Sequence, residues 1–548
     1  MNFAKRLTIF LHKDINLGVR ALILCLSGLL TGLTIAFPQI GFLQWITIVP
    51  AGVILLRRAA CNKTKLRSLY FDGLIFFYSY FLVCYHFFLS MYPLDFLEGV
   101  TSGTAAAIVV VSWFGLSLLQ ALMGALVFLF CALLFRGRIC KRVCLLKPVA
   151  VAVLWAIFEW TQNFGWWGVP WGKLALGQTE YVVGIQNASW FGSYFITFVI
   201  VLVNMCIALA LLKASKEKIV RSAAMVVVSA LIFQYATGTL IWFTTNIEEG
   251  KVTKVACIQG NISSTDKWIE NYDKMRTVYS DQTRLAAEQG AKIILWPETV
   301  IPFDVTKSSY SKYDDMCREL ADETNTYILV GAYSTQDDLK YNSILCYTPR
   351  GERLDSEYHK RRLVPFGEFV PMRDFFEVVI PPLTKMISLN DCSEGEDANI
   401  ISADGVDIGA LICFDSIYDG LTLDTVREGA DIICLSTNDS WFSGSAALGI
   451  HRSQAQLRAV ESGRYIARCA STGISSVISP RGEILDEVEA DTEGFIVYDI
   501  YQRENKTVWY YLGNSFIYLC LTFCVVAVFD RVFLKIKKGK KVDKVLPS

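Results

Sequence analysis

The chain has 548 residues, 53% of them hydrophobic, and its 52 basic and 52 acidic residues leave no net charge at pH 7. This balance leaves no excess of basic surface, so we expect no nucleic-acid partner. With 16 cysteines, only four histidines and no C-x-x-C pair, the composition argues against a metal centre and a disulfide scaffold, and we expect no cofactor.

Apolar runs occupy the first 245 residues and return near the end of the chain. They cover residues 21–37, 40–56, 69–91, 105–135, 148–164, 182–212, 223–243 and 508–529. Each is long enough, or nearly so, for the roughly 20 residues that a membrane-spanning helix needs. A cleaved signal peptide would also explain the first run, but the second follows Pro38 at once and no small-residue cleavage site is evident. The sequence therefore predicts about eight transmembrane helices, seven in a membrane domain at 1–245 and one at 508–534.

Lysine and arginine are unevenly distributed among the loops between these runs. They gather at 57–67, 136–147 and 213–221 and in a basic tail at 535–548. The loop with Asp95 and Glu98 and the loop at 165–180 are poor in them. Because basic loops stay in the cytoplasm, we expect both termini there. Seven spans before residues 246–507 and one span after them place that domain outside the cytoplasmic membrane.

Residues 246–507 alternate between short apolar runs and helical segments. The expected strands lie at 254–259, 292–296, 327–333, 342–348, 408–413, 431–436, 465–470 and 475–479, and the expected helices at 274–288 and 451–464. This alternation, with two P-R-G turns, predicts a mixed-sheet α/β sandwich.

Cys413 ends one of these apolar runs and is followed at once by Phe414 and Asp415. Such a strand-to-loop elbow leaves the sulfur at a strand end, where a pocket would open. Most cysteines in apolar runs are small core residues. Core packing is the default interpretation for four others: Cys257, Cys346, Cys434 and Cys469.

Two charged segments accompany this cysteine. Glu298 follows an apolar strand and Pro297, although a lone glutamate there is usually a solvated loop residue. Lys360 lies in H-K-R-R-L-V-P-F-G-E, which could instead be a basic surface loop whose Arg361 and Arg362 touch lipid headgroups. Glu368, in the same loop, could pair with one of these cations.

Glu298, Lys360 and Cys413 together make a chemically sufficient set for acyl transfer. A thiol needs a base, and Glu298 can serve if burial raises its pKa. Lys360 and the backbone N–H groups after Cys413 can stabilise an oxyanion. The protonated glutamate can then protonate the leaving group. No metal or cofactor is required.

The order W-P-E at 296–298, K-x-x-L-V-P-F-G-E at 360–368 and I-C at 412–413 resembles the nitrilase superfamily. Further matching stretches are Q-G-N at 259–261 with Trp268, T-N-D-S-W-F at 437–442, residues 451–464, F-E-W at 158–160 and G-V-P-W at 168–171. Because they lie in both halves of the chain, the sequence is similar to the membrane branch of that superfamily, the apolipoprotein N-acyltransferases.

This resemblance implies an αββα sandwich with Glu298 as general base, Lys360 as oxyanion stabiliser and Cys413 as nucleophile. It implies a ping-pong reaction in a bacterial cytoplasmic (inner) membrane, with the catalytic domain on the periplasmic or extracellular side. Cys413 would take the sn-1 acyl chain of a phospholipid as a thioester. The α-amine of an S-diacylglyceryl cysteine, at the N-terminus of an apolipoprotein, would then accept that chain.

The resemblance also suggests supporting roles. Glu368 would assist the lysine or the amine. Trp268, Trp441 and Asn438 are candidates for substrate binding, with the two tryptophans at the acyl or peptide entrance; both could also simply anchor at the membrane interface. The family usually has Tyr-Glu after the nucleophile, so Phe414 and Asp415 put acceptor preference in question.

Two other functions remain open from the sequence. A membrane-tethered amidase would pass the acyl group to water instead of an amine. A catalytically decayed nitrilase-like domain could act as a membrane scaffold.

Overall fold

The computed structural model describes residues 16–94, 100–263, 268–379 and 391–542, with side chains left undescribed at 268–272, 379 and 531–542. The predicted loop with Asp95 and Glu98 and the end of the predicted basic tail lie outside these residues. Contacts divide the chain into two units. Unit 1 comprises Met1–His86, Val110–Trp242 and Leu512–Ser548, and unit 2 comprises Phe87–Val109 and Phe243–Tyr511.

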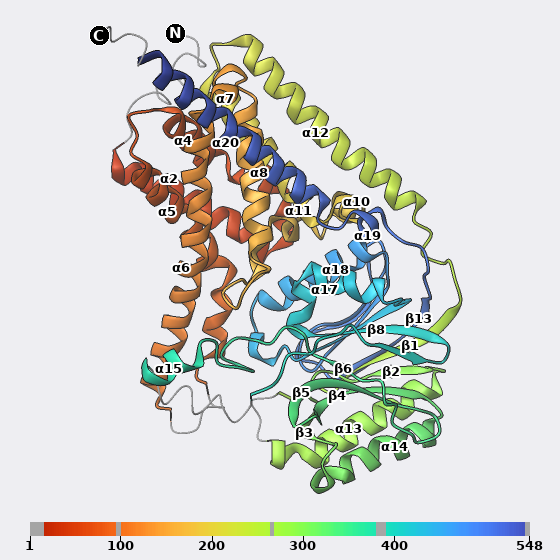
Figure 1. Ribbon diagram of the computed structural model, residues 1–548. Coiled ribbons are helices and arrows are strands. Elements are labelled where there is room, and N and C mark those ends of the chain that lie inside the picture. Colours follow the sequence, from red (N-terminus) through yellow and green to blue (C-terminus); the bar gives the residue numbers. More distant parts are fainter. Residues whose placement is uncertain (1–15, 95–99, 264–267, 380–390, 543–548) are drawn as a thin grey trace. The chain divides into compact units, whose positions relative to one another are not determined.

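Unit 1 is helical (Figure 1). Its longer helices are α2 (Leu17–Ala36), α4 (Val49–Ala60), α5 (Leu66–Cys84), α6 (Ser102–Phe135), α8 (Leu146–Thr161), α11 (Ser193–Leu212), α12 (Glu217–Thr244) and α20 (Ser515–Val542). Short helices are α3 (Gln44–Thr47), α7 (Arg138–Arg142), α9 (Val182–Ile185) and α10 (Ala188–Phe191), with 3-10 turns at Pro38–Leu43, His86–Met91, Pro170–Gly172 and Leu174–Gln178. The start of α6, the end of α12 and most of the turn His86–Met91 belong to unit 2.

Five helical stretches within the described residues are long and apolar enough to cross a membrane. They are Leu17–Ala36, Pro38–Ala60, Ser102–Phe135, Ser193–Leu212 and Glu217–Thr244, and Ser515–Asp530 is a shorter apolar stretch. Each of the eight predicted runs contains a helix. The run at 182–212 is interrupted at Gly192, which has a positive φ of 76°, and the run at 508–529 is divided at Gly513 into α19 (Val508–Leu512) and α20. The count of eight spans stays a prediction.

Two buried carboxylates in unit 1 are paired with donors on other elements, as an apolar surrounding demands. Asp72 on α5 accepts from Arg20 on α2 (2.9 Å) and Arg58 on α4 (2.7 Å). Glu159 on α8 accepts from the Leu174 N–H (2.9 Å) and from the Thr197 hydroxyl on α11 (2.6 Å). These charges connect helices to one another.

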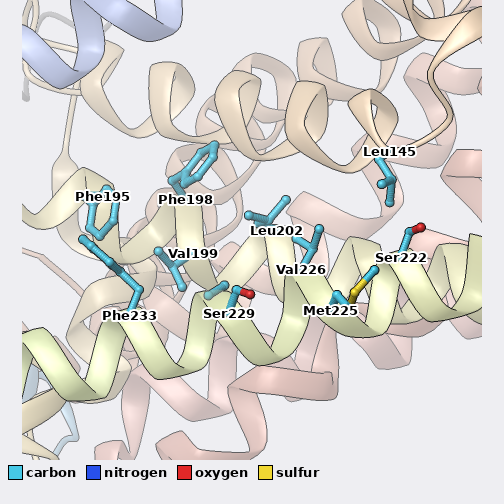
Figure 2. A pocket seen from close by; sticks show the side chains of 11 residues that line it. Leu145, Phe195, Phe198, Val199, Leu202, Ser222, Met225, Val226, Ser229 and Phe233 are labelled. Atoms are coloured by element: carbon cyan, nitrogen blue, oxygen red, sulfur yellow. The ribbon is translucent and has the colours of Figure 1, made fainter.

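An apolar groove of about 630 Å³ runs between α11 and α12. Figure 2 shows Phe195, Phe198 and Leu202 of α11 facing residues of α12 across it. The α12 side is lined by Ser222, Met225, Val226, Ser229, Ala230 and Phe233. Among the described residues that line the groove, the only polar side chains are those of Ser222 and Ser229.

Unit 2 contains two β-sheets. The first has the strand order β13-β1-β2-β4-β5-β6, with β3 beside β4. Its strands are β1 (Val252–Gln259), β2 (Ile293–Leu295), β3 (Ile301–Asp304), β4 (Tyr327–Gln336), β5 (Leu339–Tyr347), β6 (Tyr358–His359) and β13 (Gly494–Tyr501). The second has the order β12-β11-β10-β9-β8-β7. Its strands are β7 (Ile400–Ala403), β8 (Val406–Ile412), β9 (Ile432–Thr437), β10 (Ile466–Ala470), β11 (Ser475–Ile478) and β12 (Ile484–Val488).

Alternating side chains place each sheet between its partner sheet and a helical layer. In β2, Ile293 and Leu295 join the core between the sheets, whereas Ile294, and Trp296 just after the strand, face α13 (Trp268–Glu288) and α14 (Ser311–Thr324). In β8, Ile412 joins the same inner core and Leu411 faces α17 (Asp419–Arg427) and α18 (Ala447–Ser462). The result is an αββα sandwich (Figure 1), as the resemblance implied. A short helix, α15 (Arg373–Val379), lies outside these layers.

Candidate active site

The candidate residues gather where parallel strands end. Strands β1, β2 and β4 run parallel in one sheet, and β8, β9 and β10 in the other. Glu298 follows β2, Cys413 follows β8 and Asn438 follows β9. Since the carboxyl ends of parallel strands share one edge, residues distant in sequence come together there.

A buried tryptophan fixes the turn that carries Glu298. Trp296 is fully buried, its ring lies 5.0 Å from that of Tyr279, and its indole N–H donates to Thr283 Oγ1 (3.0 Å). Ser436, from the other sheet, donates to the Trp296 carbonyl (2.9 Å). Glu298 therefore leaves the end of β2 from an anchored backbone and is only 6% exposed.

Gly331 on β4 makes room for this turn. A Cβ there would lie 2.1 Å from the Pro297 carbonyl oxygen and 2.8 Å from Glu298 Cα. We expect Gly331→Ala to displace Glu298 and to destabilise unit 2 by about 1–3 kcal/mol through overpacking. Thermal unfolding measures this loss. Gly420→Ala is the control, because nothing lies within 4 Å of a Cβ at that position. Equal Tm values for the two variants would contradict the packing argument.

Lys360 is buried between two carboxylates. Its Nζ lies 2.7 Å from Glu298 Oε1 and 2.9 Å from Glu368 Oε2, and the side chain is 1% exposed. Burial alone lowers the pKa of Lys360, but the attraction of Glu298 and Glu368 outweighs it and raises the pKa well above its usual range. The lysine is therefore a fixed cation, and the basic-surface-loop interpretation is wrong for it.

Asn342, in the middle of β5, bridges the same carboxylates. Its Nδ2 donates to Glu298 Oε1 (2.8 Å) and Glu368 Oε1 (2.7 Å). The backbone carbonyl of Asn342 also accepts from the Lys360 N–H (2.8 Å). One closed hydrogen-bonded group is thus formed by Glu298, Asn342, Lys360 and Glu368.

Cys413 stands at the elbow that the sequence predicted. It follows β8, begins the 3-10 turn Cys413–Ile417, and has a positive φ of 47°. An L-residue in this region costs roughly 1–2 kcal/mol. Burial and the nearby Glu298 carboxylate raise the pKa of the Cys413 thiol well above its usual range, against the lowering effect of Lys360. At neutral pH the sulfur therefore keeps its proton, and a base is needed to make a nucleophile.

Asp415 is held by hydrogen bonds at the end of β8, and its suggested role in acceptor preference stays a prediction. It is fully buried and accepts from the Tyr358 hydroxyl (2.8 Å) and the N–H groups of Arg362 (2.8 Å) and Ile412 (3.1 Å). These contacts tie the end of β8 to the loop of Lys360. Phe414 is half-buried, with its ring edge-on to Tyr418 at 5.5 Å.

The burial of Asp415 makes the free energy of unfolding depend on pH. Burial raises the pKa of Asp415 from 3.8 to about 6. The folded chain then holds a proton that the unfolded chain has lost, so this contribution is full below the unfolded pKa and disappears as the pH rises through the folded one. We expect wild type to lose about 2 kcal/mol relative to Asp415→Asn between about pH 4 and about pH 7. Urea unfolding at both pH values measures the difference; a pH-independent difference would contradict it.

The three binding candidates behave differently. Asn438 donates its backbone N–H to Glu298 Oε2 (2.9 Å), while its side chain accepts from the Ser440 hydroxyl (2.6 Å). Trp441 is half-buried, and its carbonyl accepts from Ser90 (3.3 Å). The Trp268 side chain lies outside the described residues.

One Cys/Asp/His group could be mistaken for a metal site. Ligand atoms of Cys413, Asp439 and His451 lie within 4.8 Å of one another. However, Asp439 already contacts His451 Nδ1 (2.8 Å) and the Arg468 guanidinium. The Arg468 cation beside Asp439 opposes a metal ion there, and His451 Nε2 already lies 3.2 Å from the Cys413 carbonyl oxygen, so these groups are paired with one another instead.

Comparisons with known proteins cover both halves of the chain. The family model described as Carbon-nitrogen hydrolase matches residues 254–507, and the one described as Apolipoprotein N-acyltransferase N-terminal domain matches residues 27–206. The apolipoprotein N-acyltransferase of Geobacter metallireducens is 29% identical over 381 residues, which are 68% of this chain and 72% of the relative. The chain belongs to the apolipoprotein N-acyltransferase family.

Other members of this family are similarly related to the chain. The Vibrio vulnificus apolipoprotein N-acyltransferase is 28% identical over 385 residues, 68% of this chain and 72% of that protein. Among solved structures, a nitrilase-superfamily amidase from Nesterenkonia AN1 is 18% identical with a TM-score of 0.36, covering 46% of this chain and 93% of the amidase chain.

Sequence reasoning missed several residues around the site. Asn342 gave no signal, since a polar residue within a strand is usually solvent-facing. Arg361 was interpreted as a surface residue, but it is 8% exposed and donates to the Leu421 carbonyl (2.9 Å). Glu368 does pair with a cation of its loop, namely Lys360.

Proposed function

We propose that this chain is a membrane-bound apolipoprotein N-acyltransferase that uses Glu298, Lys360 and Cys413 as its catalytic residues. The observation that carries the proposal is the convergence of these three residues at the strand ends of a family-matched domain. The substrates are a phospholipid acyl donor and the α-amine of an S-diacylglyceryl cysteine on an apolipoprotein.

In the first half-reaction, Glu298 removes the proton of the Cys413 thiol. The sulfur attacks the sn-1 ester carbonyl, and the buried ammonium of Lys360 stabilises the oxyanion. Collapse of that intermediate breaks the ester C–O bond, and protonated Glu298 gives its proton to the departing lysophospholipid oxygen. The acyl chain is then a thioester on Cys413.

In the second half-reaction, the acceptor amine attacks the thioester carbonyl. Glu298 takes a proton from the amine, the C–S bond breaks, and the thiol is restored as the amide forms. Glu368 and Asn342 hold Lys360 and Glu298 in place through both steps. Trp441, Asn438 and Trp268 remain our candidates for substrate contact, on the strength of the family resemblance.

We infer the membrane arrangement from composition. The apolar helices support insertion, and the distribution of lysine and arginine supports cytoplasmic termini. The chain would then have a membrane domain at 1–245, a catalytic domain at 246–507 on the outer face of the bacterial cytoplasmic membrane, a last span at 508–534 and a basic tail at 535–548. Protease added to spheroplasts should cut within 246–507 and spare the tail.

The test is a transfer assay with purified protein, a defined phospholipid and a synthetic S-diacylglyceryl lipopeptide. Mass spectrometry should show one added acyl chain on the lipopeptide, and blocking its α-amine by acetylation should abolish the product. Release of free fatty acid with no acylated peptide would favour the amidase-like hydrolase. If neither product forms, the result would favour the scaffold.

A further inference from the structure

A buried chain of charged groups lies behind the candidate nucleophile. Arg468 on β10, Asp439 after β9 and His451 on α18 are each at most 1% exposed. Arg468 donates to Asp439 Oδ2, and His451 Nδ1 lies 2.8 Å from Asp439 Oδ1. The other ring nitrogen of His451, Nε2, lies 3.2 Å from the Cys413 carbonyl oxygen and 3.1 Å from Ser416 Oγ.

Hydrogen bonds orient the ring of His451. Asp439 is ionised, because Arg468 and His451 hold the pKa of its carboxyl below its usual range despite burial. A carboxylate only accepts, so His451 Nδ1 donates to Asp439. The Ser416 hydroxyl donates to the Cys413 carbonyl (2.8 Å), so both of these oxygens can accept a hydrogen bond from Nε2.

At one end of this series of charged groups, His451 contacts the strained turn at Cys413. Cys413 adopts its positive φ where β8 has ended, and its carbonyl takes hydrogen bonds from Ser416 and His451 in place of a sheet partner. A strained residue persists only where its surroundings over-determine it. His451 supplies a donor from a different element, α18, to the peptide that must stay strained.

The Asp439 end of this series of charged groups is also rigid. A Cβ at Gly473 would lie 2.3 Å from Asp439 Oδ2 and 2.6 Å from Asp439 Cβ, so the turn after β10 packs tightly on this carboxylate. The Phe442 ring stands edge-on to the His451 ring at 6.3 Å. The imidazole has one orientation in this packing.

We propose that His451 is a positioning residue: by donating to the Cys413 carbonyl and to Ser416, it holds Cys413 in the positive-φ turn that presents the sulfur to Glu298 and Lys360. Asp439 and Arg468 orient the ring. The base of the proposed reaction is Glu298, and His451 acts on the Cys413 backbone. The inference rests on the proposed function, in which Cys413 is the nucleophile.

Three substitutions test separately the hydrogen bonds that the two ring nitrogens of His451 make. His451→Gln retains a donor at the reach of Nε2, His451→Asn retains one at the reach of Nδ1, and His451→Leu retains neither. We expect the maximal rate of thioester formation to fall about 100-fold in the Leu and Asn variants and by less than about tenfold in the Gln variant, with the KM for phospholipid changed by less than about threefold.

Gln456→Leu provides the matched control. Gln456 is buried on the same helix and donates to the Gly482 carbonyl (2.8 Å), away from Cys413. Its loss should lower the Tm about as much as His451→Leu and leave the rate of the folded enzyme unchanged. If the Gln variant is no faster than the Asn variant, or if His451→Leu is no slower than Gln456→Leu, the positioning role is wrong.

A second readout keeps this test independent of the lipid substrate. Alkylation of Cys413 by iodoacetamide, followed by peptide mass spectrometry, forms a C–S bond, releases iodide and needs no phospholipid. The variants should follow the same order of rates. If wild type forms no thioester with any lipid, the proposed function fails, whereas the order of alkylation rates still decides the role of His451.

Discussion

Lys360→Met is expected to slow thioester formation by about 1,000-fold or more and to destabilise unit 2 by about 3–5 kcal/mol. The substitution leaves Glu298 and Glu368 buried side by side without the cation that now lies 2.7 and 2.9 Å from them. It also removes the charge that would stabilise the oxyanion. Mass spectrometry of the acyl-enzyme at timed intervals gives the rate, and thermal unfolding gives the stability.

Two further variants separate folding from chemistry in this prediction. Lys360→Met combined with Glu368→Gln removes one of the stranded charges, so stability should recover while the rate does not. Lys340→Met is the matched control, because this lysine on β5 lies over the Tyr333 ring (4.0 Å) and not between the two carboxylates. A single Lys360→Met variant with more than about a tenth of the wild-type rate would contradict an oxyanion role.

Glu298→Gln is expected to reduce thioester formation by about 100- to 10,000-fold, the range of general-base catalysis. The amide matches the carboxylate in size but cannot take the proton that Cys413 holds at neutral pH. Since the Glu298 carboxylate is one cause of the raised thiol pKa, its removal lowers that pKa. The residual rate of the variant should therefore rise with pH as the thiol ionises unaided.

The control for this second prediction is Glu357→Gln. Glu357 pairs with His359 (2.8 Å) beside the same sheet and contacts no proposed catalytic residue. It should leave both the rate and its pH dependence unchanged. A Glu298→Gln variant with a wild-type rate would show that another group takes the thiol proton.

The sequence predicted the strand-end residues of the site because strand ends leave local signs. An apolar run closed by Pro297 or by Cys413 marks where a side chain leaves the sheet. Asn342 and His451 leave no such sign, since each lies within a regular element. Their partners are set by distant contacts, such as Asn342 with Glu298 and His451 with the Cys413 carbonyl.

The sequence likewise predicted some strands and helices of the fold and missed others. The parallel strands β2, β8 and β9 are continuous apolar runs and were recognised as such. The strands β3 and β7 are only four residues long, so their patterns were weak. The helix α14 was not predicted, although it buries Tyr313, Cys317, Leu320 and Ala321 along one face. The strand β13 pairs with β1, and the paired residues, such as Tyr501 and Val252, are far apart in the sequence. No local pattern reveals such a pairing.

The measurement that tests the central claim most directly is the intact mass of the purified protein after incubation with a single defined phospholipid. We expect one acyl adduct that neutral hydroxylamine removes, that maps to Cys413, and that is absent from Cys413→Ala. An adduct at another residue, or none from a folded protein across several phospholipids, would contradict the thioester mechanism.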